Sequence, residues 1–187
     1  MAEPFFTVGH SDRTSVGFVE LLQESRVELV VDVRKLPGSR RFPQFDEDAL
    51  RETLAAVGIE LRRATGLTGR RPVSKDVAFA VNAWWQNRSF HNYADHALSD
   101  EFQDALAGLR EEGSMVRSAV MCSEAVWWRC HRRIIADHLL AHGEEVRHIL
   151  GADHVDAATL SLGAVVDPDG TVTYPAPTSP TPDREPR

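Results

Sequence analysis

The chain has 187 residues, of which 42% are apolar and 26% are charged, and this balance favours one globular domain with its own core. No apolar run approaches the roughly 18–20 residues of a membrane span, and the opening MAEPFFTVGH lacks the basic start of a signal peptide, so we expect no membrane association. Two cysteines exclude a disulfide framework and favour the cytoplasm, and the net charge of −7 opposes a broad nucleic-acid surface.

Short apolar runs alternate with helical patterns along the chain. Strands are predicted at residues 5–8, 28–33, 59–62, 116–121 and 145–150. Apolar residues at helical spacing predict helices at residues 14–26, 46–57, 76–86, 90–97, 99–112 and 129–142. This order predicts an α/β fold, a Rossmann-like three-layer sandwich with a mostly parallel sheet of about five strands and helices on both faces.

The pattern weakens after Gly151. Residues 159–174 predict a short hairpin around Pro168-Asp169-Gly170. Residues 175–187 contain five prolines and no apolar periodicity, which is typical of disorder. We therefore expect a single domain over residues 1–174, followed by a disordered tail.

Polar residues follow three of the predicted strands. They are Gly9-His10-Ser11 after the first strand, the segment from Arg34 after the second, and the segment from Cys122 after the fourth. Open α/β sheets bind their ligands beyond the carboxyl ends of the strands. The sequence therefore predicts one crevice lined by these three loops.

The second of these loops is rich in arginine. Residues 34–75 contain ten basic and five acidic side chains. The anion-binding candidates are Arg34, Ser39, Arg40 and Arg41, together with Arg70 in the next glycine-containing loop. Asp32 and Arg34 flank Val33 and so point the same way, either as an ion pair or as part of an anion site. The glycine-rich motifs of dinucleotide and P-loop sites do not occur.

The third loop holds both cysteines. We expect Cys130 in the first turn of a helix beside His131 and Arg132, where the helix N-terminus and the cations stabilise a thiolate. Seven residues separate Cys122 from Cys130, which fits neither a CxxC redox pair nor a zinc knuckle. A metal site would need His10, His131 or Glu124 as further donors, and zinc needs three or four donors that converge, so no metal ligand is assigned.

Glu124 lies just past the predicted fourth strand. This position suits a general acid or base. The alternative is an ion pair with Arg129 or Arg132 that holds the turn together, and we slightly favour that pairing. Tyr93 either closes over the crevice or packs its helix.

Six short segments occur in an order that resembles the DUF488 family, small bacterial and archaeal proteins of unknown function. They are Thr7-Val8-Gly9-His10-Ser11, Val31-Asp32-Val33-Arg34 with Pro37-Gly38-Ser39, Gly69-Arg70-Arg71, Tyr93-Ala94-Asp95, Met121-Cys122-Ser123-Glu124 and Trp128-Arg129-Cys130-His131-Arg132. The resemblance covers about residues 5–150 and implies a Rossmann-like α/β fold with its site in these loops. It implies no particular reaction. The chain departs from the family pattern at Leu61-Arg62-Arg63-Ala64-Thr65, where a His and an apolar residue are expected, so that segment receives no role.

Three hypotheses follow for the function. The first is a small enzyme acting on a phosphate- or carboxylate-bearing substrate, with catalytic candidates His10, Asp32, Glu124, Cys130 and His131, and with binding candidates Ser11, Arg34, Ser39, Arg40, Arg41, Arg70, Tyr93 and Arg132. The second is a nucleic-acid-binding or -processing protein, which the net charge disfavours. The third is a thiol or metal sensor that uses Cys122 and Cys130. The sequence assigns no cofactor and no oligomeric state.

Overall fold

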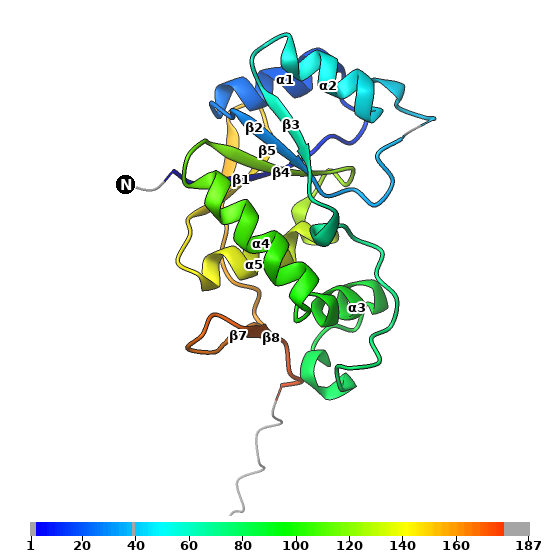
Figure 1. Cartoon of the computed structure of the whole chain (residues 1–187), viewed down its shortest axis with the longest axis vertical. Coiled ribbons are helices and arrows are strands. Elements are labelled where there is room, and N and C mark those ends of the chain that lie inside the picture. Colours follow the sequence, from blue (N-terminus) through cyan, green and yellow to red (C-terminus); the bar gives the residue numbers. More distant parts are fainter. Residues whose placement is uncertain (1–2, 39, 178–187) are drawn as a thin grey trace, which may run out of the picture.

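A six-stranded sheet forms the centre of the protein, whose computed structural model describes residues 3–38 and 40–177 (Figure 1). The strands are β1 (Phe5–Gly9), β2 (Leu29–Asp32), β3 (Glu60–Arg63), β4 (Ser118–Cys122), β5 (Val146–Gly151) and β6 (His154–Ala157). Their order in the sheet is β3-β2-β4-β1-β5-β6. The first five strands are parallel, and β6 pairs with β5 in the antiparallel direction. The predicted α/β sandwich with a mostly parallel sheet is therefore confirmed, with one strand more than expected.

Helices cover both faces of this sheet (Figure 1). They are α1 (Ser15–Glu24), α2 (Glu47–Ala55), α3 (Arg88–His96), α4 (Asp100–Gly113) and α5 (Arg132–Ala141). Three of them begin at side-chain caps, since Thr14, Asn87 and Ser99 each accept a hydrogen bond from the backbone of the first turn. Such caps satisfy the amide groups that have no partner within the helix, which explains why these helices start where they do.

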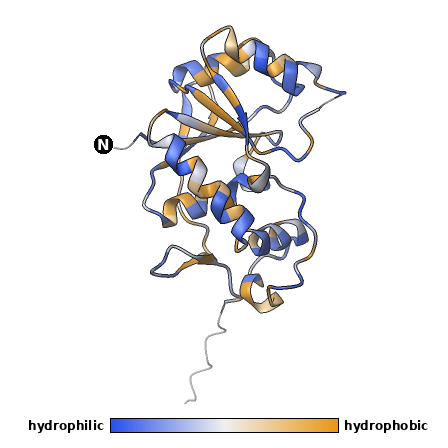
Figure 2. Ribbon diagram, in the orientation of Figure 1, coloured by the Kyte–Doolittle hydropathy of each residue, from blue (hydrophilic) through white to orange (hydrophobic). Residues whose placement is uncertain are grey.

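Two hydrophobic cores lie on the two faces of the sheet. Phe6 and Val8 of β1 pack with residues of α1 and α2, whereas Phe5 packs on the opposite face with residues of α4 and α5. Successive side chains of a strand point to opposite faces of the sheet. A strand that is covered by helices on both faces therefore carries apolar side chains at nearly every position. Figure 2 shows this in the largely hydrophobic strands of the sheet.

The helix predicted at residues 76–86 is wrong. A short 3₁₀ helix, η3 (Phe79–Asn82), lies there within irregular chain. Tertiary contacts take the place of helical hydrogen bonds: Trp84 N donates to Tyr174 O at 2.9 Å, and Asn82 Nδ2 donates to Asp95 Oδ1 at 2.7 Å. The tandem Trp84-Trp85 is therefore held by the C-terminal segment and α3.

The predicted C-terminal hairpin is confirmed as β7 (Val165–Val166) paired with β8 (Val172–Thr173). Tyr174 follows it directly, is buried, and donates its hydroxyl to Asp137 Oδ2 of α5 at 2.8 Å. Of the predicted disordered tail, residues 178–187 lie outside the described residues. Within the described residues, no helix has both the length and the apolar character needed to cross a bilayer.

Candidate functional site

The loops after β1, β2 and β4 meet at the carboxyl ends of these strands. His10 N donates to Cys122 O, and Ser11 N donates to Ser123 O, both at 3.0 Å. Val33 N donates to Met121 O, also at 3.0 Å, so parallel pairing continues past the strand ends. Because β4 lies between β1 and β2, the three polar loops lie side by side at the carboxyl end of the sheet. The side chains on these loops make up the candidate site.

Arg34 is a buried residue whose hydrogen bonds hold these loops together. Its Nε and Nη2 donate to the Asp32 carboxylate at 2.7–3.0 Å, and its Nη1 donates to Phe45 O at 2.7 Å. Asp32 and Arg34 are both buried. Burying a charged pair is favourable only when its hydrogen bonds are also satisfied, as they are here. The ion pair is thus the role that the geometry gives Arg34, and its guanidinium is not free to bind an anion.

His10 is held as a neutral ring beside this ion pair. Its Nδ1 donates to Ser11 O at 2.9 Å, its Nε2 accepts from Arg34 Nη1 at 3.3 Å, and its ring stacks on Phe45 with centroids 4.2 Å apart. Burial lowers the pKa of His10 to about 4, because the charged form loses its hydration. With both nitrogens engaged, His10 positions the β1 loop instead of offering a free base.

A cavity of about 680 Å³ opens over these groups. Its lining includes Ser11, Ser123 and two exposed arginines, Arg41 and Arg70. Arg70 forms no hydrogen bond or ion pair with any residue that the structure describes. Ser11 and Arg70 also have positive φ values of 49° and 57°, a strained conformation that tends to cluster at functional sites. Of the other anion-binding candidates, Arg40 does not line this cavity, and Ser39 lies outside the described residues.

A second cavity of about 290 Å³ adjoins the first. Its lining contains Cys122, Cys130, His131 and Glu124, and also Arg70. Tyr93 lines it too, but this residue is fully buried, and its hydroxyl donates to Leu67 O at 2.6 Å. Arg70 is therefore the side chain common to both cavities.

The two cysteines and His131 are close together at the floor of this second cavity. The two Sγ atoms and a ring nitrogen of His131 all lie within 4.8 Å of one another, and Cys130 Sγ is 3.7 Å from His131 Nδ1. The helix α5 begins at Arg132, and Cys130 is extended with φ −126° and ψ 147°. The prediction that Cys130 lies in the first helical turn is therefore wrong. A 3₁₀ turn, η4 (Trp127–Arg129), precedes it and delays the helix.

Arg132 lies beneath the cysteines and is only 1% exposed. Its Nε donates to Cys130 Sγ at 3.4 Å, its Nη1 to Thr7 Oγ1 at 3.4 Å, and its Nη2 to Glu124 O at 2.5 Å. No carboxylate of the described residues pairs with it, and neither Arg132 nor Arg129 pairs with the Glu124 carboxylate. The favoured Glu124–arginine ion pair is therefore wrong, because Arg132 binds the backbone of Glu124. Among the atoms that accept from Arg132, only Cys130 Sγ can carry a negative charge.

The pKa values of the two thiols are shifted in opposite directions. A hydrogen bond from the Cys122 thiol, and secondarily the charge of Arg132, lowers the pKa of Cys130 to about 6 against the opposing effect of burial. The same hydrogen bond, together with burial, raises the pKa of Cys122 to about 12. One thiolate and one thiol thus share the floor of the cavity, with the charge on the sulfur nearer Arg132.

Half of the basic residues in the stretch 34–75 are paired with carboxylates. Five of its ten basic residues form ion pairs, namely Arg34–Asp32, Arg51–Glu47, Arg62–Glu112, Arg63–Glu47 and Arg71–Glu101. Three of these acidic partners, Asp32, Glu101 and Glu112, come from outside the stretch. An extended footprint for a nucleic-acid backbone needs cations that are free to contact phosphates. The arginines left at the cavity form a small patch instead.

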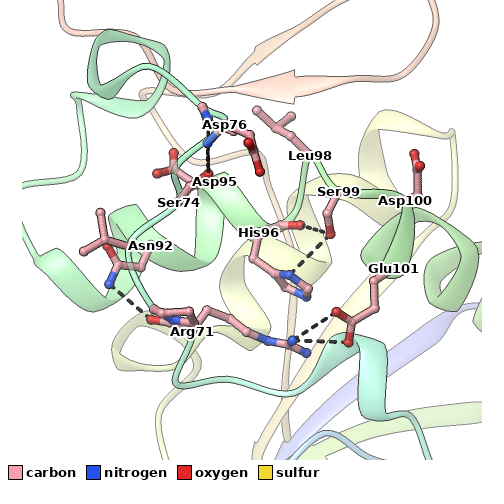
Figure 3. Close-up of a pocket in the computed structure, with 13 residues that line it drawn as sticks. Arg71, Ser74, Asp76, Asn92, Asp95, His96, Leu98, Ser99, Asp100 and Glu101 are labelled. Atoms are coloured by element: carbon pink, nitrogen blue, oxygen red, sulfur yellow. Dashed lines mark hydrogen bonds and ion pairs between the residues drawn. The ribbon is translucent and has the colours of Figure 1, made fainter.

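Another hollow, of about 520 Å³, lies beside α3 and α4 (Figure 3). Several of its polar groups are paired with one another: Arg71 Nη1 contacts Glu101 Oε1 at 3.2 Å, and Asn92 Nδ2 donates to Arg71 O at 3.1 Å. His96 Nε2 contacts Gly66 O at 2.8 Å. None of the candidate site residues lines this hollow. Its hydrogen bonds hold the loop at Arg71 onto the helices.

Two residues near the site were not predicted from the sequence. Thr7 accepts from Arg132 and contacts His148 Nδ1 at 2.7 Å, and His148 stacks on Trp127 with centroids 4.4 Å apart. Thr7 belongs to a segment that carries the family resemblance, but a threonine inside an apolar strand is common for packing reasons, so it received no role. His148 is separated from it by most of the chain and gave no signal. Burial lowers the pKa of His148 to about 4, which keeps it neutral beside Arg132.

Comparison with known proteins gave one match. A family model described as "Domain of unknown function DUF488" matches residues 15–139, about two thirds of the chain. Neither the curated proteins nor the solved structures contained a similar protein. The matched span includes β2, β4 and the start of α5, and with them the residues around both cavities except those contributed by β1 and its loop.

Proposed function

The chain belongs to the DUF488 family, whose description names no reaction, and we propose that this member is a small enzyme that binds a phosphate- or carboxylate-bearing substrate across the two adjoining cavities. The observation that carries the proposal is the position of Arg70. Arg70, whose guanidinium pairs with none of the described residues, lines both the arginine-bearing cavity and the cavity of the cysteines. A substrate whose anionic group is bound by Arg70 would have its neighbouring atoms beside Cys130, His131 and Glu124.

The anion-binding part of the site consists of Arg41, Arg70 and Ser11. A guanidinium is suited to phosphate and carboxylate because its planar donors match two oxygens at once. The surrounding ion pairs support this choice, since Arg34 and Arg71 are already bound to carboxylates, while no carboxylate of the described residues binds Arg70. An anion at Arg70 would meet a charge that no described side chain compensates.

The reacting part of the site consists of Glu124 and the cysteine–histidine floor. The Glu124 carboxylate lines the smaller cavity without an ion pair among the described residues, so it can accept or deliver a proton. His131 Nε2 donates to Val33 O at 3.2 Å, which leaves Nδ1 with its lone pair facing the cysteines. Asp32, His10, Arg34 and Arg132 then act as positioning residues that hold the loops from below.

Anion binding is tested by thermal unfolding with inorganic phosphate, using sodium chloride at matched ionic strength as the reference. We expect a saturable rise in Tm for the wild type and binding that is weaker by about 10- to 100-fold in Arg70→Gln, because one hydrogen bond to a charged group contributes about 1.5–3 kcal/mol. Arg40→Gln removes a similar exposed charge that lines neither cavity, and it should bind phosphate like the wild type. Equal weakening by both variants would reject the site.

Turnover is tested by incubating the protein with a mixture of phosphorylated and carboxylated metabolites and following their loss by mass spectrometry. We expect at least one metabolite to be consumed by the wild type and spared by Glu124→Gln. The nucleic-acid alternative is tested in parallel by gel retardation of single-stranded DNA at low salt. Retardation that falls equally in Arg70→Gln and Arg40→Gln, without any metabolite consumed, would favour that alternative over the enzyme.

A further inference from the structure

We propose that Cys122, Cys130 and His131 bind one Zn²⁺ ion through their two Sγ atoms and Nδ1, with a fourth coordination position open to the cavity beside Glu124. This inference goes beyond the proposed enzyme, because metal binding is measured without any substrate. Neither the spacing of the cysteines in the sequence nor the family description assigns a cofactor to this site.

The distances between the donor atoms fit a tetrahedral ion. Zinc bonds of about 2.3 Å to sulfur and about 2.0–2.1 Å to nitrogen place a sulfur and a nitrogen about 3.6 Å apart on a tetrahedron. The distance from Cys130 Sγ to His131 Nδ1 is 3.7 Å. All three donors lie within 4.8 Å of one another, so modest side-chain rotation suffices to close the set on one ion.

The His131 ring is oriented as a metal ligand would be. Val33 O can only accept a hydrogen bond, so His131 Nε2, 3.2 Å away, carries the proton and Nδ1 offers its lone pair to the cysteines. Metal-binding histidines typically donate their second nitrogen to a backbone carbonyl or carboxylate in this way. Gly69 leaves room for this orientation, since a Cβ atom there would lie 2.8 Å from His131 Nδ1 and would displace the ring. The hydrogen bond from His131 Nε2 to Val33 O is a separate observation from the clustering of the three donors, and it also indicates that the Nδ1 lone pair faces the cysteines.

Arg132 supplies the outer support of the thiolates. Its Nε donates to Cys130 Sγ at 3.4 Å, and the rest of its guanidinium is fixed by Thr7 and by the backbone of Glu124. Hydrogen bonds to ligating groups from such outer residues fix the ligands and tune the metal. Two thiolates, one neutral imidazole and Zn²⁺ sum to zero charge, which suits a site buried in protein.

The number of donors distinguishes this site from a purely structural one. Structural zinc sites use four protein ligands, whereas catalytic zinc sites use three and leave one position for water or substrate. The described residues offer three donors here, and Glu124 lines the cavity but is not among those within 4.8 Å. Two sulfurs and one imidazole favour zinc over magnesium or calcium, which prefer oxygen ligands.

Metal content provides the first test. The full chain, purified without a histidine tag, is dialysed against Zn²⁺, passed over a chelating resin and analysed by elemental mass spectrometry. We expect about one zinc per chain, and loss of this zinc in Cys130→Ser and in His131→Asn. His154→Asn removes an exposed imidazole of β6 that lies outside the donor set, and it should retain zinc like the wild type.

Cobalt spectroscopy of the wild type keeps the test independent of variants that fail to fold. Co²⁺ bound by two thiolates in a tetrahedral site should give an intense sulfur-to-cobalt charge-transfer band and visible ligand-field bands, all abolished by one equivalent of Zn²⁺. Gly69→Ala should weaken zinc binding by about 10- to 100-fold, because its added Cβ would push the His131 ring away from its ligating orientation, while circular dichroism reports an intact fold. Zinc lost to the resin by the wild type, or retained equally by His131→Asn, would overturn the proposal. A cobalt spectrum without charge transfer would do the same.

Discussion

His138 provides a sharp test of how burial controls stability in this fold. It lies on α5, is 0% exposed, and neither ring nitrogen has a hydrogen-bond partner among the described residues. Its ring packs against Phe102 with centroids 4.9 Å apart. An unsatisfied buried polar group costs about 1–3 kcal/mol, and a change of apolar shape costs less than about 1.5 kcal/mol. We therefore expect His138→Leu to raise the free energy of unfolding by about 1–2 kcal/mol at pH 7.5.

The stabilisation should grow as the pH falls. Burial lowers the pKa of His138 from 6.5 to about 3 in the folded protein, so below pH 6.5 the unfolded chain binds a proton that the folded chain does not. With respect to His138, the wild type therefore has its full free energy of unfolding above pH 6.5. It loses part of this free energy progressively as the pH falls from 6.5 to 3, because protonation of His138 stabilises the unfolded chain. At pH 5 the loss is about 2 kcal/mol, from about 1.36 kcal/mol per pH unit. His138→Leu lacks this loss, so its advantage over the wild type should be about 2 kcal/mol larger at pH 5.

Urea unfolding followed by tryptophan fluorescence measures both effects. His138→Gln is the matched control, because it removes the titration but keeps polar atoms in the same place. It should share the flatter pH dependence of His138→Leu without the gain at pH 7.5. If His138→Leu is less stable than the wild type at pH 7.5, or if its stability falls with pH as steeply as that of the wild type, the reasoning from burial is refuted.

Three further variants test the packing around the site, each by urea unfolding. Gly9→Ala should destabilise the protein by about 2 kcal/mol or more, because its Cβ would lie 2.0 Å from Glu124 O, and wild-type stability would contradict the close approach of the two loops. Gly108→Ala, in open space on α4, should instead stabilise the protein by about 0.5–1 kcal/mol, and a loss would show that this face is covered. Thr7→Val removes the hydroxyl that accepts from Arg132 and should cost about 1–3 kcal/mol, so an unchanged unfolding midpoint would argue against that buried bond.

The order of strands and helices could be predicted because each element carries its own periodicity. The runs that became β2 and β4 are apolar on both faces, and the helix caps Thr14 and Ser99 are local signals. The strand β6 is exposed along its whole length and carries no such pattern. The error at residues 76–86 arose because Asn82 and Trp84 are bound by distant residues, and a local pattern cannot report such bonds.

The site was predictable at the level of loops but less so at the level of side chains. Parallel strands bring their carboxyl ends together, so the meeting of three loops followed from chain order alone. Burial decided the rest. Arg34 and Arg132 look in the sequence like any other arginines, but in the fold both are buried and hold the site from beneath. The closeness of Cys122 to Cys130 depends on how residues 123–129 fold back, which their spacing does not reveal.

The central position of β1 has a consequence for how the chain folds. It precedes the other strands of this sheet along the chain, yet both its neighbours are distant in sequence: Phe6 pairs with Ala119, and Phe5 pairs with Val146. At about 5–20 residues per second, the ribosome needs about 7–30 s after completing β1 to deliver β5. During this interval the edge of β1 that later receives β5 is open to other chains. A fragment trimmed to residues 15–139 lacks both β1 and β5 and would leave the edge of β4 unpaired permanently, so we expect it to aggregate where the full chain does not.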